Sequence, residues 1–161
     1  MNLQLKLTFN FMSNKQLLLE KLKKLGFSPI ILKAFTEVDR AQFVPRDKQD
    51  LAYQDIALPI GEQQTISQPQ TVALMLGLLQ VKNNQKILEV GCGSGYVLAL
   101  LNALSPNSKI YGSELVLPLA QKASQTLADY SNIKIVHTPN NLGIPKYQPY
   151  DRILVSAASQ Q

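Results

Sequence analysis

Hydrophobic and polar residues alternate strictly at the start of the chain. The odd positions carry Leu3, Leu5, Leu7, Phe9 and Phe11, with polar residues between them. A period of two residues is typical of a β-strand. The pattern stops at Met12. We therefore expect residues 1–11 to be an extension of a domain that begins at Met12, either as an appended edge strand or as the product of an upstream start.

Helical spacing replaces this alternation after Met12. The stretch 13–16 has the sequence of a capping box, and the helix it opens ends at Gly26. Ser28 as a cap and Pro29 at the first helical position predict a second helix, to about Val38. The apolar side of the first helix is formed by Leu18, Leu22 and Leu25.

From residue 70 onward, strand patterns alternate with helical ones. The pattern predicts helices at 70–80, 96–104 and 117–129, and strands at 86–90, 109–114, 133–137 and 151–157. This alternation implies a parallel sheet covered on both faces. Right-handed crossovers make it an α/β, Rossmann-like, doubly wound fold with ligands at the carboxyl ends of the strands. We expect one domain over 12–161, in which 12–69 holds the N-terminal helices and a loop, and 70–161 holds the sheet.

Composition narrows the class of protein. The 161 residues are 45% hydrophobic and 17% charged, as in an ordinary globular domain. No apolar run approaches the roughly 20 residues of a membrane span, and the start does not read as a secretory signal. One cysteine and one histidine provide neither an internal disulfide nor a usual zinc site. We expect a cytoplasmic protein without metal or membrane contact.

The net charge of +5 is concentrated in the first part of the chain. Residues 1–50 hold nine Lys/Arg against five Asp/Glu. Lys21, Lys23 and Lys24 fall in the last turn of the first predicted helix, where cations suit the helix dipole. Because no aromatic or arginine cluster accompanies these lysines, the pattern favours a solvated helix face over a nucleic-acid surface.

A glycine-rich turn follows the first strand of the predicted sheet. Glu89 and Val90 precede a GxGxG sequence formed by Gly91, Gly93 and Gly95. Tyr96 stands where a dinucleotide fingerprint requires glycine, and the lysine of a phosphate loop is absent. With no pyrophosphate implied, the free helix N-terminus is suited to a carboxylate, such as that of a methionine moiety. We interpret Cys92 as a small turn residue, since no base adjoins it.

Glu114 closes the next strand, 23 positions beyond Gly91. In this architecture a carboxylate at that place binds ribose hydroxyls. Taken alone, Glu114 is better interpreted as an ordinary exposed strand-end acid. The acid and the glycine turn together predict S-adenosylmethionine as cofactor. Methyltransferases of nucleic-acid bases carry an Asn/Asp/Ser-Pro-Pro-aromatic stretch after the fourth strand, whereas residues 156–159 read SAAS, which argues against base methylation.

Several ordered motifs resemble the protein-L-isoaspartate O-methyltransferase family. They are RAQFVP at 40–45, YQD at 53–55, LPIGEQQTISQP at 58–69, ILEVGCGSGY at 87–96 and DRILVSAA at 151–158. The resemblance covers about Met12 to Ala158. It implies methylation of isoaspartyl residues in proteins, with Ser67 binding the isoaspartyl carboxylate beside the cofactor's methyl group. It also implies a cofactor site lined by Ile60, Gly61, Gln63, Gln64, Glu89, Gly91, Gly93, Gly95 and Glu114, and a substrate site that includes Ile66, Ser67, Ala157 and Ala158.

The implied chemistry agrees with the residues present. A carboxylate with a pKa near ~4 is an ionised nucleophile at neutral pH, so no strong base is required. Catalysis then depends on holding it in line with the methyl group and on excluding water. Neither a catalytic triad nor a metal is expected, and His137 reads as a strand residue.

The chain departs from the family pattern in two places. After the third strand the family has Gly-Asp-Gly, whose aspartate meets the adenine, and residues 138–140 read TPN. Proline offers no backbone donor, so Asn140 or the neighbouring Asn141 is the candidate for that contact. The family also continues beyond the fourth strand, whereas this chain ends at Gln161. We therefore expect an incomplete sheet with an open edge, marginal folding, either self-association through that edge or dependence on a partner, and little or no turnover.

Two alternatives remain open at this stage. One is a non-catalytic remnant that binds the cofactor or a partner. The other is a methyltransferase that acts on a small molecule or on RNA. Turnover on an isoaspartyl peptide, compared with its aspartyl twin, separates all three.

Overall fold

A four-stranded parallel sheet is the main sheet of the structure, a computed structural model that describes residues 12–141 and 143–157. The strand order is β5-β4-β3-β6. The strands are β3 (Lys86–Val90), β4 (Lys109–Glu114), β5 (Ile133–His137) and β6 (Arg152–Val155). This confirms the Rossmann-like parallel sheet, although β6 is shorter than the predicted segment 151–157. The extension predicted at 1–11 lies outside the described residues.

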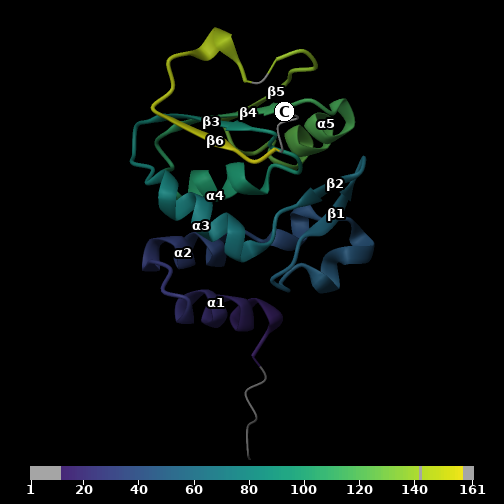
Figure 1. Ribbon diagram of the computed structural model, residues 1–161, viewed down its shortest axis with the longest axis vertical. Coiled ribbons are helices and arrows are strands. Elements are labelled where there is room, and N and C mark those ends of the chain that lie inside the picture. Colours follow the sequence, from purple (N-terminus) through teal and green to yellow (C-terminus); the bar gives the residue numbers. More distant parts are fainter. Residues whose placement is uncertain (1–11, 142, 158–161) are drawn as a thin grey trace, which may run out of the picture.

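Three helices cover one face of the sheet (Figure 1). They are α3 (Pro69–Leu79), α4 (Tyr96–Leu104) and α5 (Leu117–Thr126). The predicted α4 agrees with the structure at both ends, whereas α5 ends before the predicted residue 129. The opposite face carries a segment that we name the strap, residues 143–151, which contains the short 3-10 helix η3 (Pro145–Tyr147) (Figure 1).

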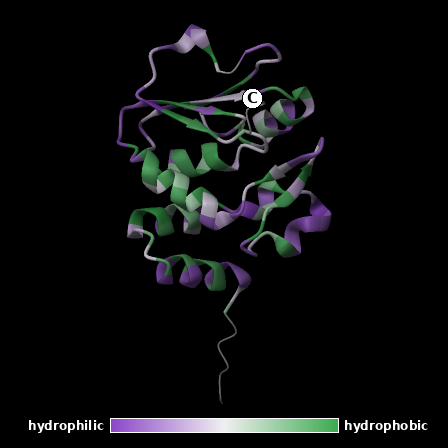
Figure 2. Cartoon of the chain, viewed as in Figure 1, coloured by the Kyte–Doolittle hydropathy of each residue, from purple (hydrophilic) through white to green (hydrophobic). Residues whose placement is uncertain are grey.

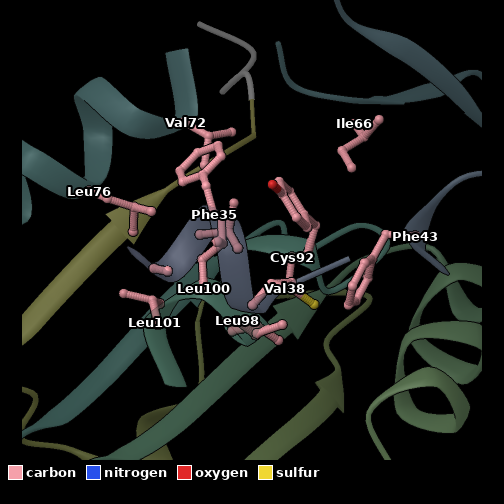
Figure 3. Packing of buried hydrophobic residues seen from close by; sticks show 14 of the residues in the cluster. Phe35, Val38, Phe43, Ile66, Val72, Leu76, Cys92, Leu98, Leu100 and Leu101 are labelled. Atoms are coloured by element: carbon pink, nitrogen blue, oxygen red, sulfur yellow. The ribbon is translucent and has the colours of Figure 1, made fainter. Parts of the chain in front are cut away.

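The main core lies between the sheet and the helices. In Figure 2, α3 and α4 are predominantly hydrophobic; α4 is buried along most of its length, whereas α3 buries one side and exposes Leu74 and Leu78. Figure 3 shows how this core continues into the N-terminal region, where Phe35 and Phe43 lie beside the side chains of the sheet-covering layer. The labelled members of the cluster are Phe35, Val38, Phe43, Ile66, Val72, Leu76, Cys92, Leu98, Leu100 and Leu101.

Two helices, α1 (Asn14–Lys24) and α2 (Pro29–Glu37), form the N-terminal layer below α3 and α4 (Figure 1). The capping box of α1 is confirmed, since Ser13 and Gln16 exchange both hydrogen bonds. Ser28 occupies the N-cap position of α2 as predicted, although its side chain makes no capping hydrogen bond within the described residues. Pro29 at the first position fixes the backbone of that turn without one.

Two short 3-10 helices and a hairpin connect the N-terminal layer to α3. The 3-10 helices are η1 (Arg40–Phe43) and η2 (Arg46–Leu51), and the hairpin pairs β1 (Leu58–Gly61) with β2 (Gln64–Ile66) in antiparallel fashion. The turn of the hairpin holds Glu62 and Gln63 at φ values of 52° and 57°. In the described part of the chain, none of the helices combines the length and hydropathy needed to span a bilayer.

Candidate cofactor and substrate site

The glycine-rich turn joins β3 to α4 at the carboxyl edge of the sheet. Gly91, Gly93 and Gly95 have φ values of +76°, +51° and +84°, a region that only glycine enters freely. The Gly91 N–H donates to the carbonyl of Ser113 at 2.8 Å, so the turn lies against the end of β4. A Cβ on Gly91 would lie 2.5 Å from the Cβ of Ala157. The chain therefore needs glycine here both for its conformation and for its contact with the end of β6.

Glu114 lies beside this turn and is only 6% exposed. One carboxylate oxygen accepts a hydrogen bond from the Gly93 N–H at 2.7 Å. The other accepts from the Val116 N–H at 2.9 Å. The alternative of an exposed strand-end acid is therefore wrong. Since a carboxylate oxygen accepts more than one hydrogen bond, both oxygens keep the capacity to bind hydroxyl groups of a ligand.

Glu89 is the second acid of the site and is 1% exposed. Its Oε1 accepts a hydrogen bond from the Ser156 hydroxyl at 2.6 Å, whereas its Oε2 is buried and has no hydrogen-bond partner among the residues that the structure describes. Burial raises the pKa of Glu89 to about 8, the Ser156 hydrogen bond opposes that rise, and the charge of Glu114 adds to it. A buried acceptor without a hydrogen-bond partner is unusual in a native protein, and a bound group that donates to it would satisfy it.

The β1–β2 hairpin lies against the glycine-rich turn. The Cδ1 atom of Ile60 lies 3.3 Å from the position that a Cβ on Gly93 would take. Ile66, on the other strand, is also buried and belongs to the main core. By contrast, Gly61, Gln63 and Gln64 lie at the exposed end of the hairpin. The structure thus brings Ile60 to the glycine-rich turn and leaves the other three residues facing solvent.

Ser67 follows the hairpin and is half-buried. Its carbonyl accepts a hydrogen bond from Nη2 of Arg40 at 3.1 Å. The same guanidinium donates to the carbonyls of Ala52 and Ile56 and lies over the Tyr96 ring, at 5.9 Å from its centroid. Burial lowers the pKa of Arg40, although nearby acidic groups oppose the change. Arg40 therefore connects the proposed substrate loop to the first residue of α4.

Sequence reasoning did not single out Arg40 or Asp55. Asp55 accepts a hydrogen bond from the Gln70 N–H at 2.8 Å, in the first turn of α3, and forms a 2.7 Å ion pair with Lys21 of α1. Burial favours a higher pKa for Asp55, but the hydrogen bonds from Lys21 and the Gln70 amide outweigh it and lower the pKa. Both residues lie in the quoted family motifs, but only the folded chain shows which groups they contact.

The remaining candidate residues are placed as follows. Asn140 is exposed in the turn after β5, next to the exposed Pro139. Ala157 lies against Gly91, and Ala158 lies outside the described residues. Burial raises the pKa of Cys92 well above its ordinary value, as for a packed thiol. Within residues 12–141 and 143–157, no group of His, Cys, Asp and Glu side chains is placed to hold a metal ion.

These groups form a cradle suited to a nucleoside that carries an amino-acid group. Glu114 presents hydroxyl acceptors beside Gly93, and the orphaned Oε2 of Glu89 suits a cation at the same edge of the sheet. The N-terminus of α4 opens into the turn without a side-chain cap. The residues present therefore fit S-adenosylmethionine.

The chain matches one family model over residues 12–161, described as protein-L-isoaspartate(D-aspartate) O-methyltransferase (PCMT). Similar curated proteins are the protein-L-isoaspartate O-methyltransferases of Methanococcoides burtonii (40% identity over 147 residues, 89% of this chain and 72% of the relative) and Dictyoglomus turgidum (44% over 145 residues, 88% and 65%). A third, from Geotalea uraniireducens, is 44% identical over 133 residues, 81% of this chain and 60% of the relative. The chain thus spans less than two thirds of the length of two of these three relatives.

Solved structures give the same picture. A protein-L-isoaspartate O-methyltransferase superposes with a TM-score of 0.76 at 29% identity, over 88% of this chain and 47% of the other. A Plasmodium falciparum protein assigned to the same enzyme class, in complex with S-adenosyl-L-homocysteine, superposes with a TM-score of 0.68 at 26% identity, over 79% and 64%. The fold described above is therefore shared with these structures.

Proposed function

The chain belongs to the protein-L-isoaspartate(D-aspartate) O-methyltransferase family, and we propose that it transfers a methyl group from S-adenosylmethionine to the α-carboxylate of L-isoaspartyl residues in damaged proteins. The methyl ester can then close to a succinimide, which reopens partly as normal aspartate. The substrates are proteins or peptides that contain isoaspartyl residues.

Besides family membership, the position of the β1–β2 hairpin supports this proposal. The β1–β2 hairpin, which precedes Ser67, lies directly against the glycine-rich turn through Ile60. A substrate held by the segment around Ser67 would thus lie next to a cofactor held by the turn and by Glu114. Arg40 supports this arrangement, because it binds the Ser67 carbonyl and lies over Tyr96 at the start of α4.

The reaction requires little of the protein beyond positioning. S-adenosylmethionine supplies an electrophilic methyl group on a sulfonium. Ser67 binds the substrate carboxylate by its hydroxyl, one carboxylate oxygen forms the new O–C bond, and the S–C bond breaks with its electron pair going to sulfur. No proton is transferred in this step, so a base is unnecessary. The buried Ile60 and Ile66 contribute an apolar wall that helps to exclude water.

The direct test is methyl transfer from labelled S-adenosylmethionine to two peptides that differ only in isoaspartate or aspartate. We expect label in a base-labile ester on the isoaspartyl peptide alone. Ser67→Ala should depress turnover while the affinity for S-adenosyl-L-homocysteine is unchanged. The exposed Ser124 of α5 provides a matched control variant, Ser124→Ala, which should behave as the wild-type chain. Equal labelling of both peptides would reject the proposed specificity.

The exposed apolar side chains of Ile153 and Val155 on β6 favour one other function, a remnant that binds the cofactor or a partner without methyl transfer, because they offer a surface to a partner. Pro139, exposed at the position of the family's adenine-contacting aspartate, would weaken the contact with adenine. Binding of S-adenosyl-L-homocysteine without labelling of either peptide would support this alternative.

Location and assembly also stay predictions. A cytoplasmic location is testable by cell fractionation. Self-association through β6 is testable by light scattering, since in the described residues β6 pairs with β3 alone.

A further inference from the structure

We propose that Ser156 is a positioning residue for cofactor binding, because its hydroxyl holds one oxygen of the Glu89 carboxyl and leaves the other oxygen for the ammonium group of the cofactor's methionine moiety. This inference rests on the proposed function, since it assumes a cofactor with an amino-acid group. Ser156 directly follows β6, whereas the acid that it orients, Glu89, lies in β3.

The contact geometry fixes both partners. The Ser156 backbone N–H donates to the Val90 carbonyl at 2.9 Å, which ties residue 156 to the end of β3. From this anchored position the Ser156 hydroxyl donates to Oε1 of Glu89 at 2.6 Å. The two residues are 67 positions apart in the chain. Since Glu89 accepts this bond from a group with a fixed backbone, its carboxyl has a fixed orientation.

The free oxygen of Glu89 is suited to a cation. Oε2 is buried and has no hydrogen-bond partner in the described structure. A carboxylate in such surroundings is costly to leave uncompensated, and a cation that binds there removes this cost. The second acid, Glu114, already receives two backbone N–H groups and is suited to hydroxyls instead. The two acids of the site therefore differ in the chemistry that each one can receive.

The Ser156 hydroxyl also affects the ionisation of Glu89. The pKa of Glu89 is raised to about 8 by burial, and the Ser156 hydrogen bond acts in the opposite direction. Glu89 must be ionised to attract an ammonium group. Losing the Ser156 hydroxyl would thus both release the carboxyl from its orientation and favour its neutral form at neutral pH.

The test compares two ligands by calorimetry at pH 7. S-adenosyl-L-homocysteine has the amino-acid group, whereas 5′-methylthioadenosine keeps the nucleoside and the sulfur without it. Ser156→Ala should weaken binding of S-adenosyl-L-homocysteine by about tenfold, the size expected for losing a hydrogen bond to a charged group, and leave 5′-methylthioadenosine unchanged. Ser156→Thr retains the hydroxyl and should restore wild-type affinity. Ser124→Ala is the control for an unrelated serine.

A double-mutant cycle separates positioning from general damage. Glu89→Gln should also weaken binding of S-adenosyl-L-homocysteine and leave binding of 5′-methylthioadenosine unchanged. Adding Ser156→Ala to Glu89→Gln should weaken binding of S-adenosyl-L-homocysteine by less than about a further twofold. If Ser156→Ala weakens the binding of both ligands equally, or of neither, this inference is wrong, whereas the proposal that the chain binds the cofactor is unaffected. If the wild-type chain binds neither ligand, the cofactor part of the proposed function is wrong and this inference falls with it.

Discussion

The two faces of the parallel sheet are covered in different ways. On the first face, Ile87 and Ile110 are fully buried beneath α3, α4 and α5. On the second face, Leu88 and Val90 are buried by the strap, but their neighbours on β6, Ile153 and Val155, are 54% and 57% exposed. The register pairs Leu88 with Ile153 and Val90 with Val155, so these residues share one face.

This difference indicates that each face of the sheet contributes to stability according to how completely its apolar side chains are buried. Helices bury the first face across the sheet, and their apolar residues form one continuous core. The strap covers the second face with an aromatic cluster in which Tyr111 stacks on Tyr147 at 4.6 Å and meets Tyr150 at 5.9 Å. We therefore expect the first face to dominate stability and the uncovered part of the second face to govern association.

The largest expected effect comes from a matched pair of isoleucines on neighbouring strands. Ile87→Ala should lower the free energy of unfolding by about 2–5 kcal/mol, because it removes a fully buried side chain. Ile153→Ala should cost less than about 1 kcal/mol, since more than half of that side chain already contacts solvent. Urea denaturation of both variants measures the difference. Equal losses would show that the two faces contribute alike.

Glu89 lies on the first face, since it alternates with Leu88 and Val90, and its burial predicts a pH dependence. Its pKa rises from 4.5 in the unfolded chain to about 8 in the folded one. The buried Glu89 carboxyl therefore stabilises the folded chain most when it is protonated in both states, below pH 4.5. This contribution to the free energy of unfolding is lost as the pH rises through about 8, because ionisation is unfavourable in the buried site. Glu89→Gln should change stability little at pH 5 and raise it by on the order of 3 kcal/mol near pH 8.5.

The measurement for Glu89 is urea unfolding of both proteins across pH 5–9 without ligand. Glu114→Gln is a useful comparison, because that carboxylate already receives two backbone N–H groups and the substitution replaces an acceptor oxygen with a donor. It should destabilise the chain at neutral pH. A Glu89→Gln effect that is independent of pH would contradict the ionisation argument.

Substitutions in the aromatic cluster measure how much the strap contributes to stability through its contacts with the second face of the sheet. Tyr111→Ala should cost roughly 1–3 kcal/mol, because it removes the ring on which both Tyr147 and Tyr150 pack. Tyr111→Phe keeps the ring and should stay within about 0.5 kcal/mol of the wild-type chain. Thermal unfolding followed by circular dichroism measures both. A Tyr111→Ala loss as large as that of Ile87→Ala would remove the proposed contrast between the faces.

The smallest effect on stability is expected at the exposed apolar residues of β6. Val155→Lys should change the free energy of unfolding by less than about 0.5 kcal/mol, since its side chain is 57% exposed. If the open edge drives self-association, the lysine should reduce it, because charge discourages edge-to-edge pairing. Light scattering over a range of concentrations reads out assembly. Lys109→Ala, at the exposed amino end of the central strand β4, should leave assembly unchanged.

Much of the fold was predictable because its determinants are local. The capping box at Ser13, the strand at 86–90 and the helix at 96–104 follow from spacing within a few residues. The glycine-rich turn also follows from sequence, since only glycine adopts three positive φ values so close together. The hairpin at 58–66 was not predicted as such, because Glu62 and Gln63 occupy its turn at positive φ in place of the usual Asn-Gly.

Periodicity and turn chemistry act over short distances, so the order of the elements, the parallel sheet and the residue types at its carboxyl edge were predictable from the sequence. Tertiary packing establishes which of those residues meet. Arg40 reaches the Ser67 carbonyl across 27 positions, and Ser156 reaches Glu89 across 67. Within the described part of the chain, tertiary packing also determines that Glu89 is buried with one oxygen unpartnered and that Ile153 is exposed. Burial and pairing of this kind depend on packing between distant segments, which no local pattern specifies.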